Sequence, residues 1–149
     1  MRQNTGVLSE ERRSEFREIG EAVRAWASTS DEIVGALLAG SWARGAARMD
    51  SDVDVVVVVT ETECFVHSES WIAEAVGKAA ELVRTGDWGA LIERRVRLRS
   101  GLEIEFGFVK PSWAHTDPVD PGTHRVVTDG YEIWYDPEGH LTGLVATLG

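Results

Sequence analysis

The chain has 149 residues, of which 43% are hydrophobic, and this length and composition predict a single domain that spans residues 1–149. Its 25 acidic and 15 basic side chains give a formal net charge of −10, which disfavours long nucleic acids as ligands, because an acidic surface repels their phosphate backbone. The longest apolar run, Val53–Val59, contains Asp54 and is too short to cross a bilayer, and the segment after Met1 does not resemble a targeting signal, so the sequence predicts a cytoplasmic protein without a membrane span.

The first part of the chain is predicted to fold as a helix followed by two buried strands. Ser9 is a favourable N-cap, and apolar residues recur every three or four positions from there to about Ser28, which predicts an amphipathic helix. The runs Ile33–Ala39 and Val53–Val59 are short and apolar, as expected for buried strands. The small, polar segment Ser41–Ser51 between them predicts one helical turn and a loop.

A second helix is expected after these strands. Ser68 and Ser70 are alternative N-caps, and apolar residues continue at helical spacing from Trp71 to Val83. The sequence Thr85-Gly86-Asp87 then predicts a break in the chain. We therefore expect this helix to cover about residues 70–83.

The next segment predicts a β-hairpin whose two faces differ in character. Leu91–Leu98 and Leu102–Val109 alternate in polarity, and Gly101 supplies the left-handed residue that a three-residue turn needs. With this turn, apolar residues face apolar residues and arginines face glutamates. The expected facing pairs are Leu98–Leu102, Val96–Ile104, Arg97–Glu103 and Arg95–Glu105.

The C-terminal part is predicted to hold a long loop, a hairpin and a short helix. Pro111–Gly122 is rich in Pro, Gly and Asp and reads as the loop. Arg125–Val127 and Tyr131–Tyr135 flank Thr128-Asp129-Gly130 and predict the hairpin. Leu141–Leu148 predicts the helix.

These elements predict an α+β (or α/β) fold. We expect a mixed β-sheet of about five strands flanked by helices. The core is expected over residues 9–109, with a C-terminal hairpin and tail over residues 110–149.

Two carboxylates begin the second buried strand and indicate a metal site. Residues two apart on a strand point to the same side, so Asp52 and Asp54 share one face while Val53 faces the other. Two carboxylates held this close repel each other unless a cation lies between them. Mg²⁺ is the natural candidate, because it prefers oxygen ligands and is held by a few carboxylates together with substrate phosphates.

The segment before this strand has the character of a phosphate-binding loop. Gly40 lets the backbone approach a phosphate without a clashing Cβ, and Ser41 offers a hydroxyl and a backbone N–H group. Arg44 and Arg48 in the same segment are candidates to neutralise triphosphate charge. The alternative for both arginines is an ordinary solvated loop charge.

These residues together resemble a known signature. Gly40-Ser41-Trp42-Ala43-Arg44-Gly45, followed by Asp50-Ser51-Asp52-Val53-Asp54, is similar to the motif of the DNA polymerase beta nucleotidyltransferase superfamily, most of all to its small bacterial antibiotic and minimal nucleotidyltransferases. The order of elements extends the resemblance over about residues 9–109. The resemblance implies two magnesium ions, a nucleoside triphosphate as co-substrate, and transfer of a nucleoside monophosphate to an acceptor hydroxyl.

The resemblance also implies a third carboxylate on a later strand. Glu103 and Glu105 both lie on the polar face of the hairpin, so strand parity cannot choose between them. Glu105 is preferred because it lies in the body of the strand between apolar neighbours, although glutamate replaces the aspartate that is commoner in the family. The implied roles are that Asp52 and Asp54 bind the ion on the triphosphate, and that these two with Glu105 bind the ion that activates the acceptor, with Glu105 a candidate to accept its proton.

The predicted function is transfer of a nucleoside monophosphate, from ATP as the expected donor, to a hydroxyl of a small-molecule acceptor such as an antibiotic. One alternative is nucleotidylation of a protein or tRNA by a minimal nucleotidyltransferase of a toxin–antitoxin pair. A second is a nucleotide-binding module without catalysis. Because the chain has no room for the separate helical domain of larger relatives, a homodimer that completes the acceptor cleft is also predicted.

Overall fold

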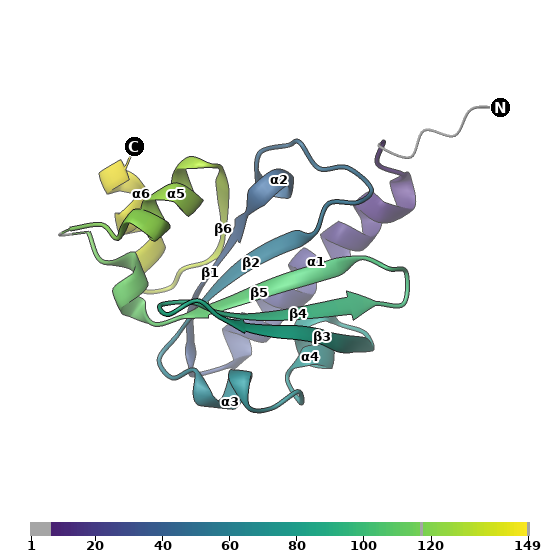
Figure 1. Ribbon diagram of the computed structural model, residues 1–149, viewed down its shortest axis with the longest axis horizontal. Coiled ribbons are helices and arrows are strands. Elements are labelled where there is room, and N and C mark those ends of the chain that lie inside the picture. The colour runs from purple at the N-terminus through teal and green to yellow at the C-terminus, as the bar shows by residue number, and fades with distance from the viewer. Residues whose placement is uncertain (1–6, 117, 149) are drawn as a thin grey trace.

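The computed structural model describes residues 7–116 and 118–148 and contains a mixed six-stranded sheet with helices on both faces (Figure 1). The strand order is β3-β4-β5-β2-β1-β6, in which β2 and β5 are parallel and the other neighbours are antiparallel. The predicted α+β fold with a mixed sheet is confirmed, with six strands in place of about five. The strands are β1 Ile33–Ala39, β2 Val53–Val59, β3 Ala80–Asp87, β4 Ile92–Leu98, β5 Glu103–Val109 and β6 Tyr131–Tyr135.

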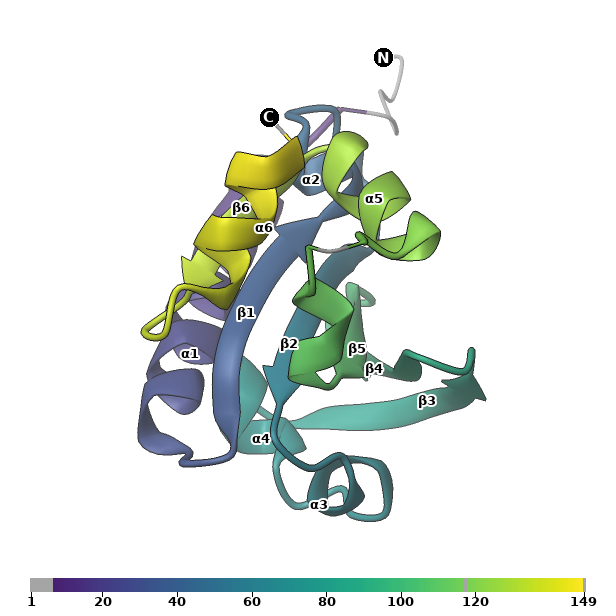
Figure 2. The ribbon, with the colours of Figure 1, turned by 90° about the vertical axis from the view of Figure 1, so that its left-hand side faces the viewer.

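Helices cover the two faces of the sheet with separate hydrophobic clusters. One cluster joins the sheet to α1, α3 and α4, and the other joins it to η1, α5 and α6. Figure 2 shows α5 and α6 beside β1, with α5 at the end where α2 follows this strand. No helix in the described part of the chain is long and apolar enough to cross a membrane. The helices are α1 Glu10–Thr29, α2 Gly40–Ala43, α3 Glu63–Val66, α4 Ile72–Val76, the 3₁₀ helix η1 Pro111–Ala114, α5 Pro121–Thr128 and α6 His140–Leu148.

The valine run of β2 is explained by its place in the middle of the sheet. Val53 and Val55 pack in the cluster on the α1 side, and Val56 packs in the cluster on the α5 side. A strand that is buried on both faces needs apolar residues at every position. Asp54 follows the parity of Val56, so its carboxylate lies on the α5 side, at the end of β2 where the sheet stops being covered.

Several predicted elements agree with the structure. Helix α1 begins after Ser9 and ends at Thr29, β1 and β2 have the predicted bounds, and the segment after β1 forms one helical turn. The hairpin of β4 and β5 has the predicted register, with Arg95 opposite Glu105. The C-terminal helix is also present, as α6.

The predicted helix over about residues 70–83 is confirmed only over α4 and is wrong after Val76. Helix α4 ends at Val76, because Gly77 adopts a left-handed conformation with φ +78°, and Ala80–Asp87 is the edge strand β3. Strand β3 pairs with β4, with Ala80 opposite Leu98. The apolar spacing of this segment fits a helix, but pairing with the hairpin decides its conformation, and the predicted break at residues 85–87 lies inside the strand.

The predicted C-terminal hairpin is also wrong. Residues 125–127 belong to α5, which begins at Pro121 and is capped by Asp120, whose side chain accepts hydrogen bonds from the next turn. Strand β6 pairs instead with β1, which precedes it by about a hundred residues. Asp-Pro at a helix N-terminus and Asp-Pro in a loop look alike in sequence, so the predicted loop over 111–122 in fact contains η1 and the start of α5.

The cap of α1 gives a prediction for stability. The Ser9 hydroxyl accepts the backbone N–H of Arg12 at 3.1 Å, so Ser9→Ala is expected to lower the free energy of unfolding by about 1 kcal/mol. Ser28→Ala is the control, because this exposed hydroxyl only donates to the Ala25 carbonyl in the last turn and its loss is expected to cost less than about 0.5 kcal/mol. Urea denaturation measures both, and equal effects would contradict the capping role.

Candidate active site

Two carboxylates from neighbouring strands line one cavity. Asp54 of β2 is the register partner of Glu105 in the parallel β2–β5 pair. Both line a cavity of about 270 Å³, whose wall also includes Gly40 at the end of β1 and Val126 and Asp129 at α5. The cavity therefore lies between the sheet and α5, beside the hydrophobic cluster that includes η1, α5 and α6.

Gly40 is required by the position of the Asp54 side chain. Its φ is +74°, and a Cβ atom built on it would lie 2.3 Å from Oδ2 of Asp54. A residue with a Cβ atom would therefore overlap the Asp54 carboxylate unless the turn or the carboxylate moved. Glycine at this position therefore leaves space for the Asp54 carboxylate, and the predicted contact of Gly40 with a phosphate stays a prediction.

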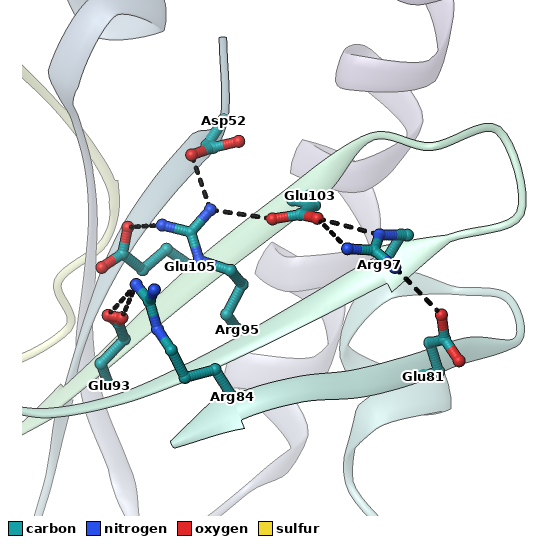
Figure 3. A network of polar contacts seen from close by, with 8 residues as sticks. All are labelled: Asp52, Glu81, Arg84, Glu93, Arg95, Arg97, Glu103 and Glu105. Carbon is teal, nitrogen blue, oxygen red and sulfur yellow. Dashed lines mark hydrogen bonds and ion pairs between the residues drawn. The ribbon is translucent and has the colours of Figure 1, made fainter. Parts of the chain in front are cut away.

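Arg95 forms ion pairs with Asp52, Glu103 and Glu105 (Figure 3). Its Nη1 lies 2.6 Å from Oδ2 of Asp52 and 3.0 Å from Oε1 of Glu103, and its Nη2 lies 2.8 Å from Oε2 of Glu105. The Arg95 side chain is only 15% exposed. Glu103 also pairs with Arg97, at 2.7 Å.

Several carboxylates lie close together in the site, and the pKa values of Asp54 and Glu105 are raised. Burial raises the pKa of Asp54, and the charge of Asp52 adds to this effect. Burial, a hydrogen bond with Glu93 and the charge of Asp54 raise the pKa of Glu105 to about 8, although Arg95 opposes the shift. Burial is the largest of these effects, and the ion pair with Arg95 at 2.8 Å does not offset it.

Glu93 is a member of this network that the sequence reasoning missed. It is 1% exposed and accepts two hydrogen bonds from Nη2 of Arg84, at 2.8 and 3.1 Å. Burial opposes its ionisation, but hydrogen bonds with Glu105 and Arg84 lower its pKa overall. Its parity on β4, two residues before Arg95, was the signal that places it on the polar face of the hairpin.

Of the two basic residues of the predicted phosphate-binding loop, Arg44 contacts a residue of the cavity wall and Arg48 does not. Arg44 is the C-cap of α2 and its Nη1 lies 3.7 Å from Oδ2 of Asp129, which was not predicted as a site residue. Arg48 lies farther along the loop, with its Nε 3.9 Å from the exposed Asp50. Ser41 follows Gly40 in the turn α2.

The donor atoms suit magnesium, but the carboxylates are not assembled around one point. All the predicted ligands offer carboxylate oxygens, which hard divalent ions prefer, and Gly40 leaves room for Asp54 at the cavity. Within residues 7–116 and 118–148, no three His, Cys, Asp or Glu side chains are close enough to hold one ion. The guanidinium of Arg95 lies between Asp52 and Glu105.

The raised pKa of Glu105 predicts a pH dependence for the metal-free protein. Its ordinary pKa of 4.5 becomes about 8 in the folded state, so folding binds a proton between these values and the free energy of unfolding falls as the pH rises through this window. The melting temperature in EDTA is therefore expected to fall more steeply between about pH 5 and about pH 8 for the wild type than for Glu105→Gln. Parallel curves would contradict the shift.

Comparison with known families supplies a match over the N-terminal half. A family model described as streptomycin adenylyltransferase matches residues 13–87, about half of the chain. The matched region includes Gly40, Asp52 and Asp54 and ends before Glu105. No curated protein matches the chain by sequence.

Solved structures share the fold at low sequence identity. The structure of a cytoplasmic RNA terminal U-transferase has a TM-score of 0.50 and 19% identity over 69% of this chain and 31% of its own. Cid1 poly(U) polymerase with magnesium and 3′-dATP bound gives 0.52 and 16% over 69% and 32%, and Cid1 with the UTP analogue UMPNPP gives 0.51 and 16% over 83% and 35%. The predicted polymerase beta-like nucleotidyltransferase fold is confirmed, and the chain spans about a third of the length of these proteins.

Proposed function

The chain belongs to the streptomycin adenylyltransferase family, and on this premise we propose that it is a magnesium-dependent nucleotidyltransferase. The acceptor hydroxyl attacks the α-phosphorus of a nucleoside triphosphate, which transfers a nucleoside monophosphate to a small acceptor and releases pyrophosphate. ATP is the proposed donor, because the family is described by adenylyl transfer. The proposed acceptor is a cationic antibiotic of the aminoglycoside class.

The observation that carries the proposal is the placing of Asp54 and Glu105 on adjacent parallel strands at one cavity, against the backbone of Gly40. Asp52 and Asp54 are proposed to hold the metal that binds the triphosphate. The same two residues with Glu105 are proposed to hold a second metal beside the acceptor hydroxyl. Glu105 is also proposed to take the proton of that hydroxyl, because it lines the cavity beside Asp54.

The turn after β1 is proposed to contact the triphosphate. Gly40 and Ser41 offer backbone N–H groups without a bulky side chain between them and the cavity, and Ser41 adds a hydroxyl. Arg44 and Arg48 are proposed to neutralise phosphate charge. When bound, the magnesium ions would neutralise the triphosphate and polarise the acceptor hydroxyl.

Charge supports a cationic acceptor. Besides the two proposed metal ligands the cavity wall carries Asp129, and the chain has a formal net charge of −10. An acidic cleft raises the local concentration of a cationic substrate and repels RNA. For this reason the small-molecule acceptor is preferred to an RNA end, although the solved relatives include RNA-modifying enzymes.

The experiment is a transfer assay with ATP labelled at the α-phosphate and Mg²⁺. Aminoglycosides, their N-acetylated derivatives, a tRNA and a protein mixture serve as acceptors. The proposal predicts label on the unmodified aminoglycosides and much less on the acetylated ones, which keep the hydroxyl groups but lose positive charge. Label on tRNA or protein alone would overturn the proposed acceptor class.

Three broader predictions from the sequence belong to the same proposal. They are a single domain over residues 1–149, a cytoplasmic location and a homodimer in which a second copy completes the acceptor cleft. Light scattering on the purified chain tests the last of them. A monomeric mass at the concentration of the transfer assay would contradict the homodimer.

A further inference from the structure

We propose that Arg95 is the counter-ion of Asp52 and Glu105 in the metal-free protein, and that a metal must displace it from both carboxylates. In this proposal, Glu103 retains its ion pair with Arg95 after the metal binds. The inference rests on the proposed function, since it takes Asp52 and Glu105 as metal ligands. It assigns Arg95 a positioning role that acts on metal binding. It also gives Glu103 a role different from that of Glu105.

The guanidinium and a divalent ion would use the same oxygen atoms. Arg95 is within 2.6 Å of Oδ2 of Asp52 and within 2.8 Å of Oε2 of Glu105, the two carboxylates that flank the proposed metal position together with Asp54. A divalent ion on the same oxygen atoms would lie close to the guanidinium, and the two positive charges would repel each other. Metal binding therefore requires the guanidinium to withdraw.

The hydrogen-bond donors of Arg95 are only partly satisfied. Among the described residues, its buried Nε atom has no hydrogen-bond partner. Its stem is enclosed, with 15% of the side chain exposed, so the guanidinium has little water around it. Its ion pairs with the three carboxylates therefore fix the position of the guanidinium. A divalent ion bound to Asp52 and Glu105 would remove two of these three ion pairs.

Glu103 offers a place to which Arg95 can withdraw. It lies on the opposite side of the Arg95 guanidinium from Glu105 (Figure 3), and already accepts a hydrogen bond from Nη1 of Arg95 at 3.0 Å. Glu103 also forms an ion pair with Arg97, at 2.7 Å. Rotation of the Arg95 side chain toward Glu103 would free Glu105 while the ion pair with Glu103 persists.

Mn²⁺ binding, measured by electron paramagnetic resonance without substrate at about pH 8, tests the inference without relying on turnover. Arg95→Met keeps the apolar stem and removes the competing charge, so we expect its Kd for Mn²⁺ to be about tenfold lower than that of the wild type. Arg97→Met is the matched control, because Arg97 lies on the same strand face and contacts Glu103 and Glu81 but neither Asp52 nor Glu105. Its Kd is expected to stay within about twofold of the wild-type value.

A double-mutant cycle tests the role of Glu103. Glu103→Gln leaves Arg95 with Asp52 and Glu105 as its charged partners, so Mn²⁺ binding is expected to weaken severalfold. In the Arg95→Met background the same change is expected to have no effect, because there is no arginine left to accommodate. If Glu103→Gln weakens binding equally in both backgrounds, Glu103 acts on the metal directly and this part of the inference is overturned.

The outcomes separate the inference from the proposed function. If the wild type and Arg95→Met bind Mn²⁺ with equal affinity, or if the wild type binds it more tightly, the inference is overturned. The proposed function is unaffected by either result. Absence of Mn²⁺ binding in both chains would overturn the two together. Arg95→Lys serves if Arg95→Met does not fold as judged by circular dichroism, and its Kd is expected to lie below the wild-type value, because one ammonium group cannot bridge three carboxylates.

Discussion

Asp54→Asn is expected to lower the rate of nucleotidyl transfer by about a thousandfold, while the chain stays folded. The amide keeps the shape of the side chain against Gly40 but removes the negative charge that is proposed to bind both metals. Stability is expected to be unchanged or higher, because burial disfavours the charged form of Asp54 and raises its pKa. Initial rates with saturating ATP and acceptor, together with a thermal melt, measure the two quantities.

Asp50→Asn is the matched control for this variant. It makes the same chemical change four residues earlier, in an exposed side chain that contacts Arg48 and lies outside the cavity. Its rate is expected to stay within about twofold of the wild type. If Asp54→Asn retained more than a tenth of the wild-type rate, Asp54 would not be an essential metal ligand.

Gly40→Ala is expected to lower kcat/KM by about a hundredfold, because a misplaced reacting group is costly even when the change is small. The new Cβ would lie 2.3 Å from Oδ2 of Asp54, so either the carboxylate or the turn must move. The positive φ adds a destabilisation of about 1 to 2 kcal/mol for a residue with a Cβ. Steady-state kinetics and urea denaturation measure the two effects.

Gly45→Ala separates the steric effect from the backbone effect. Gly45 lies in the same loop with φ +71°, but a Cβ on it would meet nothing within 4 Å. We expect a similar loss of stability and almost no loss of activity. Equal losses of activity in the two variants would mean that the contact with Asp54 is not what makes Gly40 important.

The parts of the fold that could be predicted from the sequence are those set by local pattern. The β-branched run of β2 and the matching faces of the β4–β5 hairpin define their elements and register without reference to the rest of the chain. The edge strand β3 could not be predicted in this way, because the spacing of its apolar residues also suits a helix. Its conformation depends on pairing with β4 and on the left-handed Gly77, which ends α4. The same applies to β6, whose partner β1 is distant in sequence.

For the candidate site, strand parity placed Asp52 and Asp54 on one face, but it could not choose between Glu103 and Glu105. The parallel pairing of β2 with β5 sets Glu105 beside Asp54, and no local pattern specifies this pairing. Arg95 was predicted as a partner of Glu105 across the hairpin. Its contact with Asp52 depends on the position of a third strand, which no local pattern specifies.

Calorimetry of ATP binding, with Mg²⁺ and with EDTA, tests the central claim most directly when the wild type is compared with Asp52→Asn. The account predicts that the wild type binds ATP much more tightly with Mg²⁺ than with EDTA, and that Asp52→Asn loses this dependence on the metal while its melting temperature is retained. If the wild type bound ATP equally well with and without Mg²⁺, or did not bind it at all, the chain would have the fold of its family without the proposed metal-dependent activity.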